Sequence, residues 1–365
     1  MQIIDQSTYT LPAGIRNILL IQLGDIGDVV WTTPGIRAVK NSIPGAKVSI
    51  MVKDHFGGLL AADPSIQKIL EIKRYPGNIF KQTLGHLSFL KQIRKERFDL
   101  AVDLRLGDRG AFMAFATGAP MRMTMHHTEG LPWWRNMLFT HAAIPADLPP
   151  ERGAAEQSLR ILRVLGMDTN DKIPRLWVSD SIKKRIQEIL SQEKADGLSH
   201  WITINPFSRW PYKEWVDSCW VEIMNWLWRD FAIPIIIIGS QEERQKAEAL
   251  IRQCDAKAFN FAGLTTLAEL AGLLSQSLLH IGVDSAAPHI AAATGVPTVT
   301  IYGPSSWFDW APQGEEHRVI VSEMPCVPCH RKGCDGSGQS RCLDTLRPDQ
   351  VKNVLAQALN QRKRY

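Results

Sequence analysis

The segment LLHIGVDSAAPHIAAATGVPTVTIYGPSS, residues 278–306, places two short apolar runs on either side of an alanine-rich stretch. Residues 278–283 and 296–302 are predicted to be buried strands, because they are short and rich in branched apolar side chains. Ser285 is a suitable N-cap for a helix between them, and Pro288 falls in the first turn, where its missing N–H is not needed. Two strands joined through a helix predict a parallel sheet with helices on its faces.

The rest of the second half repeats this alternation of strand and helix. Further strands are predicted over 200–205, 233–239 and 256–262, and further helices over 214–229, 241–253 and 265–276. A final helix over 348–365 would present one apolar face, made by Val351, Val354, Leu355 and Ala358.

The first half follows the same scheme. Strands are predicted over 15–22, 46–52, 66–72, 98–104 and 121–126, and helices over 29–42 and 79–96. Proline-rich segments at 144–153 and 172–180 indicate a linker. We therefore expect an α/β protein with a Rossmann-like domain over 1–170, a second over 171–347 and a C-terminal helix over 348–365. Loops after the strands of both domains would line a central cleft.

Composition narrows the function classes. With 45% hydrophobic and 22% charged residues, the chain is globular rather than disordered. No apolar run reaches the roughly 18–20 residues that span a bilayer, and the first residues lack a signal-peptide pattern, so a cytoplasmic protein is expected. The net charge of +5 is too small for a dedicated nucleic-acid binder but suits anionic small molecules or an anionic membrane face.

The loop QLGDIGDVV, residues 22–30, follows the first predicted strand and opens a helix. Gly24 and Gly27 alone do not make the three-glycine dinucleotide fingerprint, which disfavours a dehydrogenase. Asp28 has two interpretations: a general base in a reaction, or the N-cap of the following helix.

The loop NPFSRWPYKEW, residues 205–215, also follows a predicted strand. Ser208, Arg209 and Lys213 combine a hydroxyl with two cations, which suits a diphosphate. The simpler interpretation is a solvated basic turn.

The loop at the end of strand 278–283 offers a third group of ligands. The first N–H groups of the helix, at Ser285 and Ala286, can hold a phosphate, and Asp284 or Ser285 can position a sugar hydroxyl. His289 either contacts the phosphates or is a packed helix residue.

A fourth strand-end loop begins at residue 239. Glu242 or Glu243 in this loop can accept hydrogen bonds from a ribose, although glutamates are also favourable in the first turn of any helix.

Together these segments resemble one family, the ADP-heptose:lipopolysaccharide heptosyltransferases of glycosyltransferase family 9. The resemblance covers nearly the whole chain. It is carried by ILLIQLGDIGDVVWTTPGIRAVKNSIPGAKVSIMV, NPFSRWPYKEW, GVDSAAPHIAAATGVPTVTIYGPSSW, PCVPCHRKGC with RCL, and RPDQV.

The resemblance implies a GT-B fold, with acceptor binding by the N-terminal domain and nucleotide-sugar binding by the C-terminal domain. It also implies inverting transfer that needs no metal or other catalytic cofactor. Asp28 matches the family's catalytic aspartate, and Lys213 matches a lysine near the donor phosphates. Asp284 and His289 match the acid and histidine of the donor loop.

The implied partners are ADP-heptose and a lipid-anchored saccharide, met in transient contact with the inner membrane; no nucleic acid is implied. Basic and aromatic residues at 81–97 and 131–139 suit that surface, or simply cover a sheet. Arg105, Arg109 and Arg122 are candidates for acidic acceptor groups. Alternatives are a protein acceptor, another donor sugar, a nucleotide-sugar epimerase or a non-catalytic binder of nucleotide sugars.

Six cysteines occur, and four of them are clustered near the end of the chain. In a reduced compartment this spacing favours a structural zinc or iron ion over disulfides, the alternative being plain thiols in a packed loop. The cluster consists of Cys326, Cys329, Cys334 and Cys342.

Overall fold

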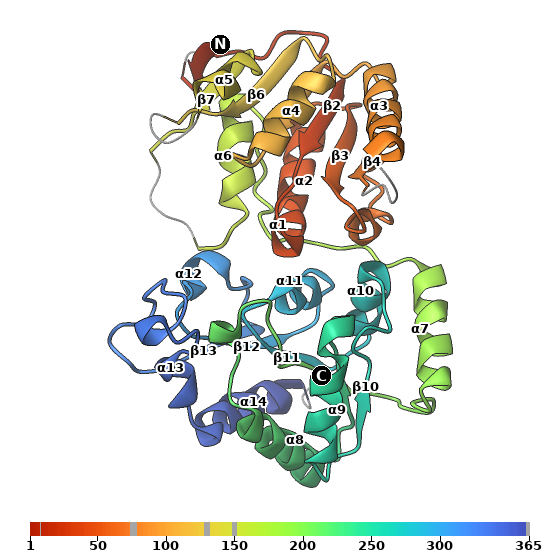
Figure 1. Cartoon of the computed structure of the whole chain (residues 1–365), viewed down its shortest axis with the longest axis vertical. Helices are drawn as coiled ribbons and strands as arrows, with labels where there is room; N and C mark the ends of the chain where they lie inside the picture. The colour runs from red at the N-terminus through yellow and green to blue at the C-terminus, as the bar shows by residue number, and fades with distance from the viewer. Residues whose placement is uncertain (8, 74–78, 128–131, 148–151, 363–365) are drawn as a thin grey trace. The chain divides into compact units, whose positions relative to one another are not determined.

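The computed structural model describes residues 1–7, 9–73, 79–127, 132–147 and 152–362. The chain divides into two compact units, Met1–Trp177 and Val178–Tyr365. Each unit is built on its own parallel sheet with helices packed against it (Figure 1).

The described residues of the first unit form a seven-stranded, all-parallel sheet in the order β1-β7-β6-β5-β2-β3-β4. Counted from β2, six of these strands have the Rossmann order 3-2-1-4-5-6, and β1 is added beside β7. The chain therefore reverses direction across the sheet between β2 and β5. The strands are β1 (Gln2–Asp5), β2 (Asn17–Ile21), β3 (Lys47–Lys53), β4 (Ile66–Ile72), β5 (Leu100–Asp103), β6 (Met121–Met125) and β7 (His141–Ile144).

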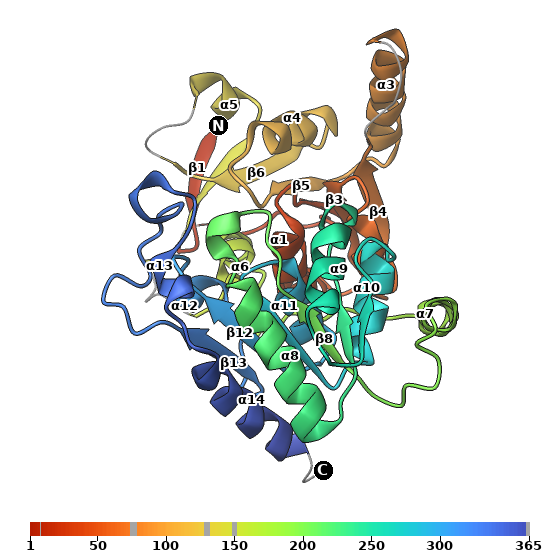
Figure 2. The same ribbon diagram turned by 60° about the horizontal axis from the view of Figure 1, so that its bottom comes forward.

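The helices α3 (Ile79–Lys95), α4 (Asp108–Ala116) and α5 (Trp133–Met137) lie on one face of this sheet, as the two views agree (Figures 1 and 2). Side chains from α3 and α4 share a buried cluster with alternate residues of the strands, among them Leu19 and Ile21 of β2. The remaining elements of the unit are α1 (Ile26–Trp31), α2 (Thr33–Ser42), η1 (Gly57–Leu60) and α6 (Glu156–Val164).

The second unit has a six-stranded parallel sheet in the order β10-β9-β8-β11-β12-β13, counted over its described residues. Counted from β8 this is again 3-2-1-4-5-6, with the reversal between β8 and β11. The strands are β8 (Ile202–Asn205), β9 (Ile235–Ile237), β10 (Ala258–Asn260), β11 (Leu279–Val283), β12 (Thr298–Tyr302) and β13 (His317–Val321).

The last helix of the chain belongs to the core of the second unit, because Val351, Leu355 and Leu359 are buried in one cluster with strand residues. The helical segments of this unit are α7 (Asp180–Gln192), η2 (Pro211–Lys213), α8 (Asp217–Phe231), η3 (Gln241–Glu243), α9 (Arg244–Arg252), α10 (Leu267–Ser275), α11 (Ala286–Ala293), α12 (Trp307–Trp310), η4 (Cys334–Gly336), α13 (Arg341–Asp344) and α14 (Pro348–Arg362).

The expectation of an α/β protein with two Rossmann-like parallel sheets is confirmed, and each predicted strand is present. Three strands, β1, β7 and β13, were not predicted. The assignment of acceptor binding to 1–170 and donor binding to 171–347, and the cleft between them, remain predictions. Among the described residues, no helix is both long enough and apolar enough to cross a membrane.

Candidate active site

Asp28 lies at the chain reversal of the first sheet, in the first turn of α1. Its side chain is 11% exposed. One carboxylate oxygen, Oδ2, accepts the backbone N–H of Asp25 at 2.6 Å, and the other, Oδ1, accepts Nη1 of Arg105 at 2.7 Å. Arg105 follows β5, the neighbour of β2, so the sheet order brings the two loops together.

The N-cap of α1 is Asp25, not Asp28, so the N-cap interpretation of Asp28 is corrected. Asp28 instead occupies the third helical position and accepts the N–H of the cap residue. Burial raises the pKa of the Asp28 carboxyl, while Arg105 and the Asp25 N–H oppose the rise. A carboxylate with a raised pKa is a stronger base than an exposed one, which suits proton abstraction.

A buried ion pair between Asp103 and Arg135 lies next to Arg105 and holds its backbone. Asp103, the last residue of β5, accepts the backbone N–H of Arg105 at 3.2 Å and Nη2 of Arg135 at 2.9 Å. Both partners of the ion pair are buried, and burial raises the pKa of Asp103 to about 7 against the opposing effect of Arg135. The sequence does not predict this pair. Asp103 can be recognised in the sequence as an acid at the end of a predicted strand. Its partner Arg135 cannot, because it lies 32 residues further along the chain.

Two glycines make room for these carboxylates. A Cβ atom on Gly24 would lie 2.3 Å from Oδ2 of Asp28, and a Cβ on Gly110 would lie 2.3 Å from Oδ1 of Asp103. Both distances are far shorter than a van der Waals contact. Each carboxylate therefore occupies the space that a side chain would take.

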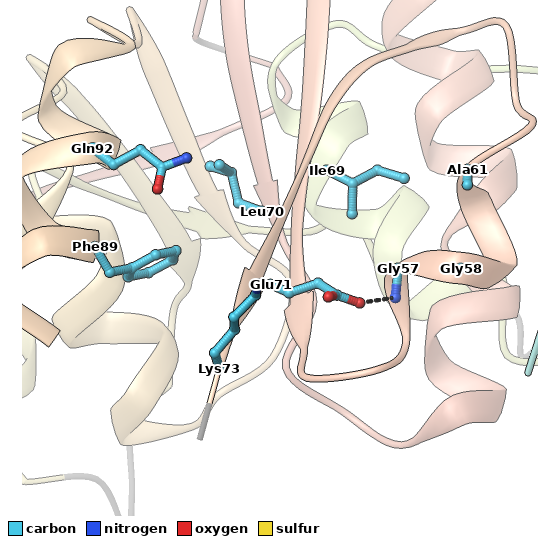
Figure 3. Close-up of a pocket in the computed structure, with 9 residues that line it drawn as sticks. All are labelled: Gly57, Gly58, Ala61, Ile69, Leu70, Glu71, Lys73, Phe89 and Gln92. Atoms are coloured by element: carbon cyan, nitrogen blue, oxygen red, sulfur yellow. Dashed lines mark hydrogen bonds between the residues drawn. The ribbon is translucent and has the colours of Figure 1, made fainter. Parts of the chain in front are cut away.

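The first unit also contains a cavity of about 540 Å³ between η1, β4 and α3 (Figure 3). Glu71 points toward η1 and accepts the Gly57 N–H at 2.8 Å. The lining combines apolar and charged residues, namely Gly57, Gly58, Ala61, Ile69, Leu70, Glu71, Lys73, Phe89 and Gln92.

The second sheet brings predicted site residues together at its own reversal. Lys213, in η2 after β8, lies with Nζ 2.6 Å from Oδ2 of Asp284, which follows β11. The two side chains are 21% and 8% exposed. A second contact joins the ends of the same two strands: Asn205, the last residue of β8, donates from Nδ2 to Oγ of Ser285 at 3.0 Å. Lys213 and Asp284 are 71 residues apart in the sequence, and the pairing of β8 with β11 brings them together.

Ser285 precedes α11 as expected, but its hydroxyl is engaged by Asn205 and makes no cap bond to the first turn. The helix proper begins at Ala286. His289 is buried one turn further on. Burial lowers its pKa to about 4, with Asp284 opposing the shift and Lys213 adding to it, so the imidazole is neutral at pH 7.

The other donor-loop candidates lie on the surface of the same unit. Ser208 accepts the N–H of Trp210 at 3.3 Å, and the neighbouring Arg209 is exposed. Glu243 accepts the Ser240 N–H at 2.6 Å, which is the helix-capping role of the simpler interpretation. Glu242 is exposed, and hydrogen bonds from its own N–H and from Ser240 lower its pKa, so it remains ionised.

The four clustered cysteines differ in exposure. Cys326 is exposed, whereas Cys342 is buried. Burial, followed by the neighbouring thiols of Cys329, Cys334 and Cys326, raises the pKa of Cys342 to about 11. In the part of the chain that the structure describes, no three His, Cys, Asp or Glu side chains are arranged to hold a metal ion.

Two Rossmann-type sheets in one chain are also found in solved glycosyltransferases. A glycosyl transferase family 9 protein from Veillonella parvula DSM 2008 has a TM-score of 0.77 at 19% identity, covering 95% of this chain and 97% of that one. The Escherichia coli ADP-heptose lipopolysaccharide heptosyltransferase II has a TM-score of 0.74 at 21% identity, with 95% and 99% covered. The fold is therefore the GT-B fold of these glycosyltransferases.

The chain belongs to glycosyltransferase family 9 (heptosyltransferase), whose sequence model matches residues 86–338. Among its relatives, lipopolysaccharide heptosyltransferase 3 of Escherichia coli (strain K12) is 27% identical over 297 residues, covering 79% of this chain and 83% of the relative. A more distant structure, the iron-containing dodecameric glycosyltransferase TibC from enterotoxigenic E. coli H10407, has a TM-score of 0.58 at 15% identity, with 96% and 80% covered.

Proposed function

We propose that this chain is an inverting glycosyltransferase that moves a heptose from ADP-heptose to an inner-core sugar of lipopolysaccharide. The observation that carries the proposal is the Asp28 carboxylate, only 11% exposed and with a raised pKa, at the reversal of the first sheet. Membership of family 9 and the names of the relatives support the heptose donor and the lipopolysaccharide acceptor.

In this proposal Asp28 is the general base. A sugar hydroxyl is a weak nucleophile, so a carboxylate must accept its proton as the oxygen attacks the anomeric carbon of the heptose. The bond from that carbon to the diphosphate breaks, and ADP leaves. Attack from the face opposite the leaving group inverts the anomeric configuration.

Lys213 and the start of α11 stabilise the departing diphosphate. The ammonium and the first N–H groups, including that of Ala286, supply positive charge where negative charge develops. Arg209 and Ser208 are assigned to the same phosphates, because they share a loop with Lys213. Asp284 holds the ammonium in place at 2.6 Å. Because the protein itself supplies this positive charge, the proposed transfer needs no catalytic cofactor.

The rest of the donor is assigned to neighbouring loops. Glu242 follows β9, the second strand of the sheet, where Rossmann-type proteins place an acid against a ribose. We assign Glu242 to the ribose of ADP, and Glu243 to the cap of η3. Ser285 and the neutral His289 are assigned to uncharged polar contacts with the donor.

The acceptor is assigned to the first unit. Its 540 Å³ cavity, with Glu71 and Lys73 on the lining, has the size and charge to take part of a saccharide. A lipid-anchored acceptor would bring the enzyme to the cytoplasmic surface of the inner membrane, in transient contact.

A structural ion at the four cysteines is a separate proposal. The thiols are close enough to raise the pKa of Cys342, and TibC, of the same fold, is iron-containing. Binding would require the sulfurs to converge and lose their protons. Elemental analysis of the purified protein that finds neither zinc nor iron would end this proposal.

The function is tested with ADP-heptose and heptose-deficient lipopolysaccharide, by following ADP release together with the mass of the acceptor. We expect an acceptor that is heavier by one heptose and ADP in equal amount. Two other products would point to the alternatives: an isomerised donor without acceptor indicates an epimerase, and transfer only to a protein indicates a protein acceptor. No turnover of any kind would leave a nucleotide-sugar binder.

A further inference from the structure

The outer surface of α3, α4 and α5 differs in composition from the rest of the molecule. Thirteen large apolar side chains are exposed among the described residues, and six of them lie on these three helices, against two in the whole second unit. Trp133 is 75% exposed and Met137 67%. The six are Leu84, Leu87, Phe112, Phe115, Trp133 and Met137.

The same helices have an excess of positive over negative side chains. They contain six Lys or Arg residues against the single acid Asp108, a balance of +5 that equals the net charge of all 365 residues. The helix α3 contains no acidic residue in its 17 positions. Since Arg135 is buried against Asp103, five of the six cations remain on the outer side.

Cations and apolar side chains are interleaved on this surface. Leu84, Leu87 and Lys91 are spaced three and four residues apart, so they share one side of α3. Arg109, Phe112 and Phe115 are spaced three apart along α4, and all three are exposed.

The three helices form a continuous face. The rings of Phe112 on α4 and Trp134 on α5 stack at 5.1 Å, and Nε of Arg94 on α3 donates to the Ala116 carbonyl of α4 at 3.2 Å. The helices lie on one side of the sheet in both views (Figures 1 and 2). We call the exposed residues of this surface the α3–α5 face.

We propose that the α3–α5 face docks on a lipid bilayer that contains anionic lipids. Tryptophan and long apolar side chains enter the headgroup region, while Lys and Arg side chains meet anionic headgroups.

A second copy of the chain is a poor occupant for this face, because a two-fold contact would oppose one cationic face to another. The proposal rests on the face itself and deepens the proposed function by stating how the enzyme reaches a lipid-anchored acceptor.

The test is flotation of the full chain with vesicles of phosphatidylcholine and with vesicles in which phosphatidylglycerol replaces part of it. We expect binding to the anionic vesicles only, weakened by added salt. Lys91→Gln with Lys95→Gln removes two exposed cations and should lower partitioning roughly 30-fold. Trp133→Ser with Met137→Ser removes the two most exposed apolar side chains and should lower it on the order of tenfold.

A matched control removes two exposed cations from the second unit, through Lys184→Gln with Arg252→Gln, and should leave flotation unchanged. Equal flotation of wild type and both face variants would overturn the proposal, as would a control variant that loses binding to the same extent. A face variant that changes the molecular mass in solution, without vesicles, would assign the face to a second copy instead.

Activity on detergent-dispersed acceptor separates the two proposals. All surface variants should transfer heptose at the wild-type rate there, because none of the substituted residues belongs to the catalytic site. A wild type that floats but transfers nothing would refute the proposed function alone, and one that transfers without floating would refute the docking face alone.

Discussion

Each unit of this chain has an ion pair at the reversal of its sheet, but the acid and the cation have exchanged loops between the two units. In the first, the loop after β2 supplies an acid, Asp28, and the loop after β5 supplies a cation, Arg105. In the second, the loop after β8 supplies the cation, Lys213, and the loop after β11 supplies the acid, Asp284. Strand order 3-2-1-4-5-6 places these two loops side by side in either sheet.

The order of the strands therefore determines which loops meet but not the chemistry of their side chains. Desolvation outweighs the nearby cation at Asp28, so the carboxyl pKa rises and the group is suited to receive a proton. At the other reversal the cation is again the more exposed partner, as Arg105 is beside Asp28, but here it lies in one loop with Ser208 and Arg209, which add a hydroxyl and a second positive charge. One reversal is thus suited to base chemistry and the other to anion binding.

Replacing the base should have the largest effect. Asp28→Asn keeps the shape of the side chain and an acceptor for the Asp25 N–H, but removes the proton acceptor. We expect kcat to fall by about 10²–10⁴ while the donor Kd hardly changes. Asp25→Asn, in the same loop but 61% exposed, is the control and should retain most activity. Equal turnover in Asp28→Asn would remove the base assignment.

Replacing the cation at the other reversal should affect binding as well as rate. Lys213→Met removes a charge-assisted contact to the diphosphate, so donor affinity should fall about 10–100-fold, and kcat should fall with it. Lys246→Met, a more exposed lysine of the same unit, is the control. Since Lys213→Met leaves Asp284 buried and unpaired, thermal melting should be compared with Lys213→Met/Asp284→Asn. Donor affinity at the wild-type level in a folded variant contradicts the phosphate role.

The pH dependence of kcat tests the ion pair between Arg105 and Asp28. The guanidinium lowers the pKa of Asp28, so Arg105→Gln should raise that pKa further. Because the ionised carboxylate is the active form, the acid limb of the kcat profile should move to higher pH, by up to about one unit. Arg109→Gln, an exposed arginine of α4, should leave the limb in place. A shift toward lower pH would reject the assigned coupling.

The smallest expected effect is on stability. An acid whose pKa is higher in the folded than in the unfolded state favours folding while protonated, and this contribution is lost as pH rises through the folded pKa. At neutral pH the ionised Asp28 therefore lowers stability, and Asp28→Asn should melt a few degrees higher. The gain should vanish below the ordinary carboxyl pKa of about 4. Calorimetry at several pH values measures it, and a lower melting temperature at neutral pH would contradict the desolvation of Asp28.

The sequence predicts the central strands because buried parallel strands are continuous apolar runs, as in NILLI of β2. It misses β1 and β7, in which the apolar residues of QIID and HAAI are bounded by polar residues or proline and belong to no longer apolar run, and β13, an edge strand with polar His317 and Arg318. The loops that carry Asp28 and Lys213 are predictable for the same reason as the strands that precede them.

What the sequence does not show is which loops meet. The contacts of Asp28 with Arg105 and of Lys213 with Asp284 depend on strands that are far apart in the chain but neighbours in the sheet. The pairing of Asp103 with Arg135 depends in addition on a short helix that no periodicity marks. Spatial order, not residue type, is the missing information.

The bare Cα atoms of Gly24 and Gly110 have a consequence for genetics. In a library of all single substitutions under selection for transferase activity, both positions should be as intolerant as residue 28, because even alanine would displace a carboxylate by filling its space. Neither glycine has a side chain that could take part in the reaction. A mutational map interpreted without the structure would score both as catalytic, when what they supply is an empty volume.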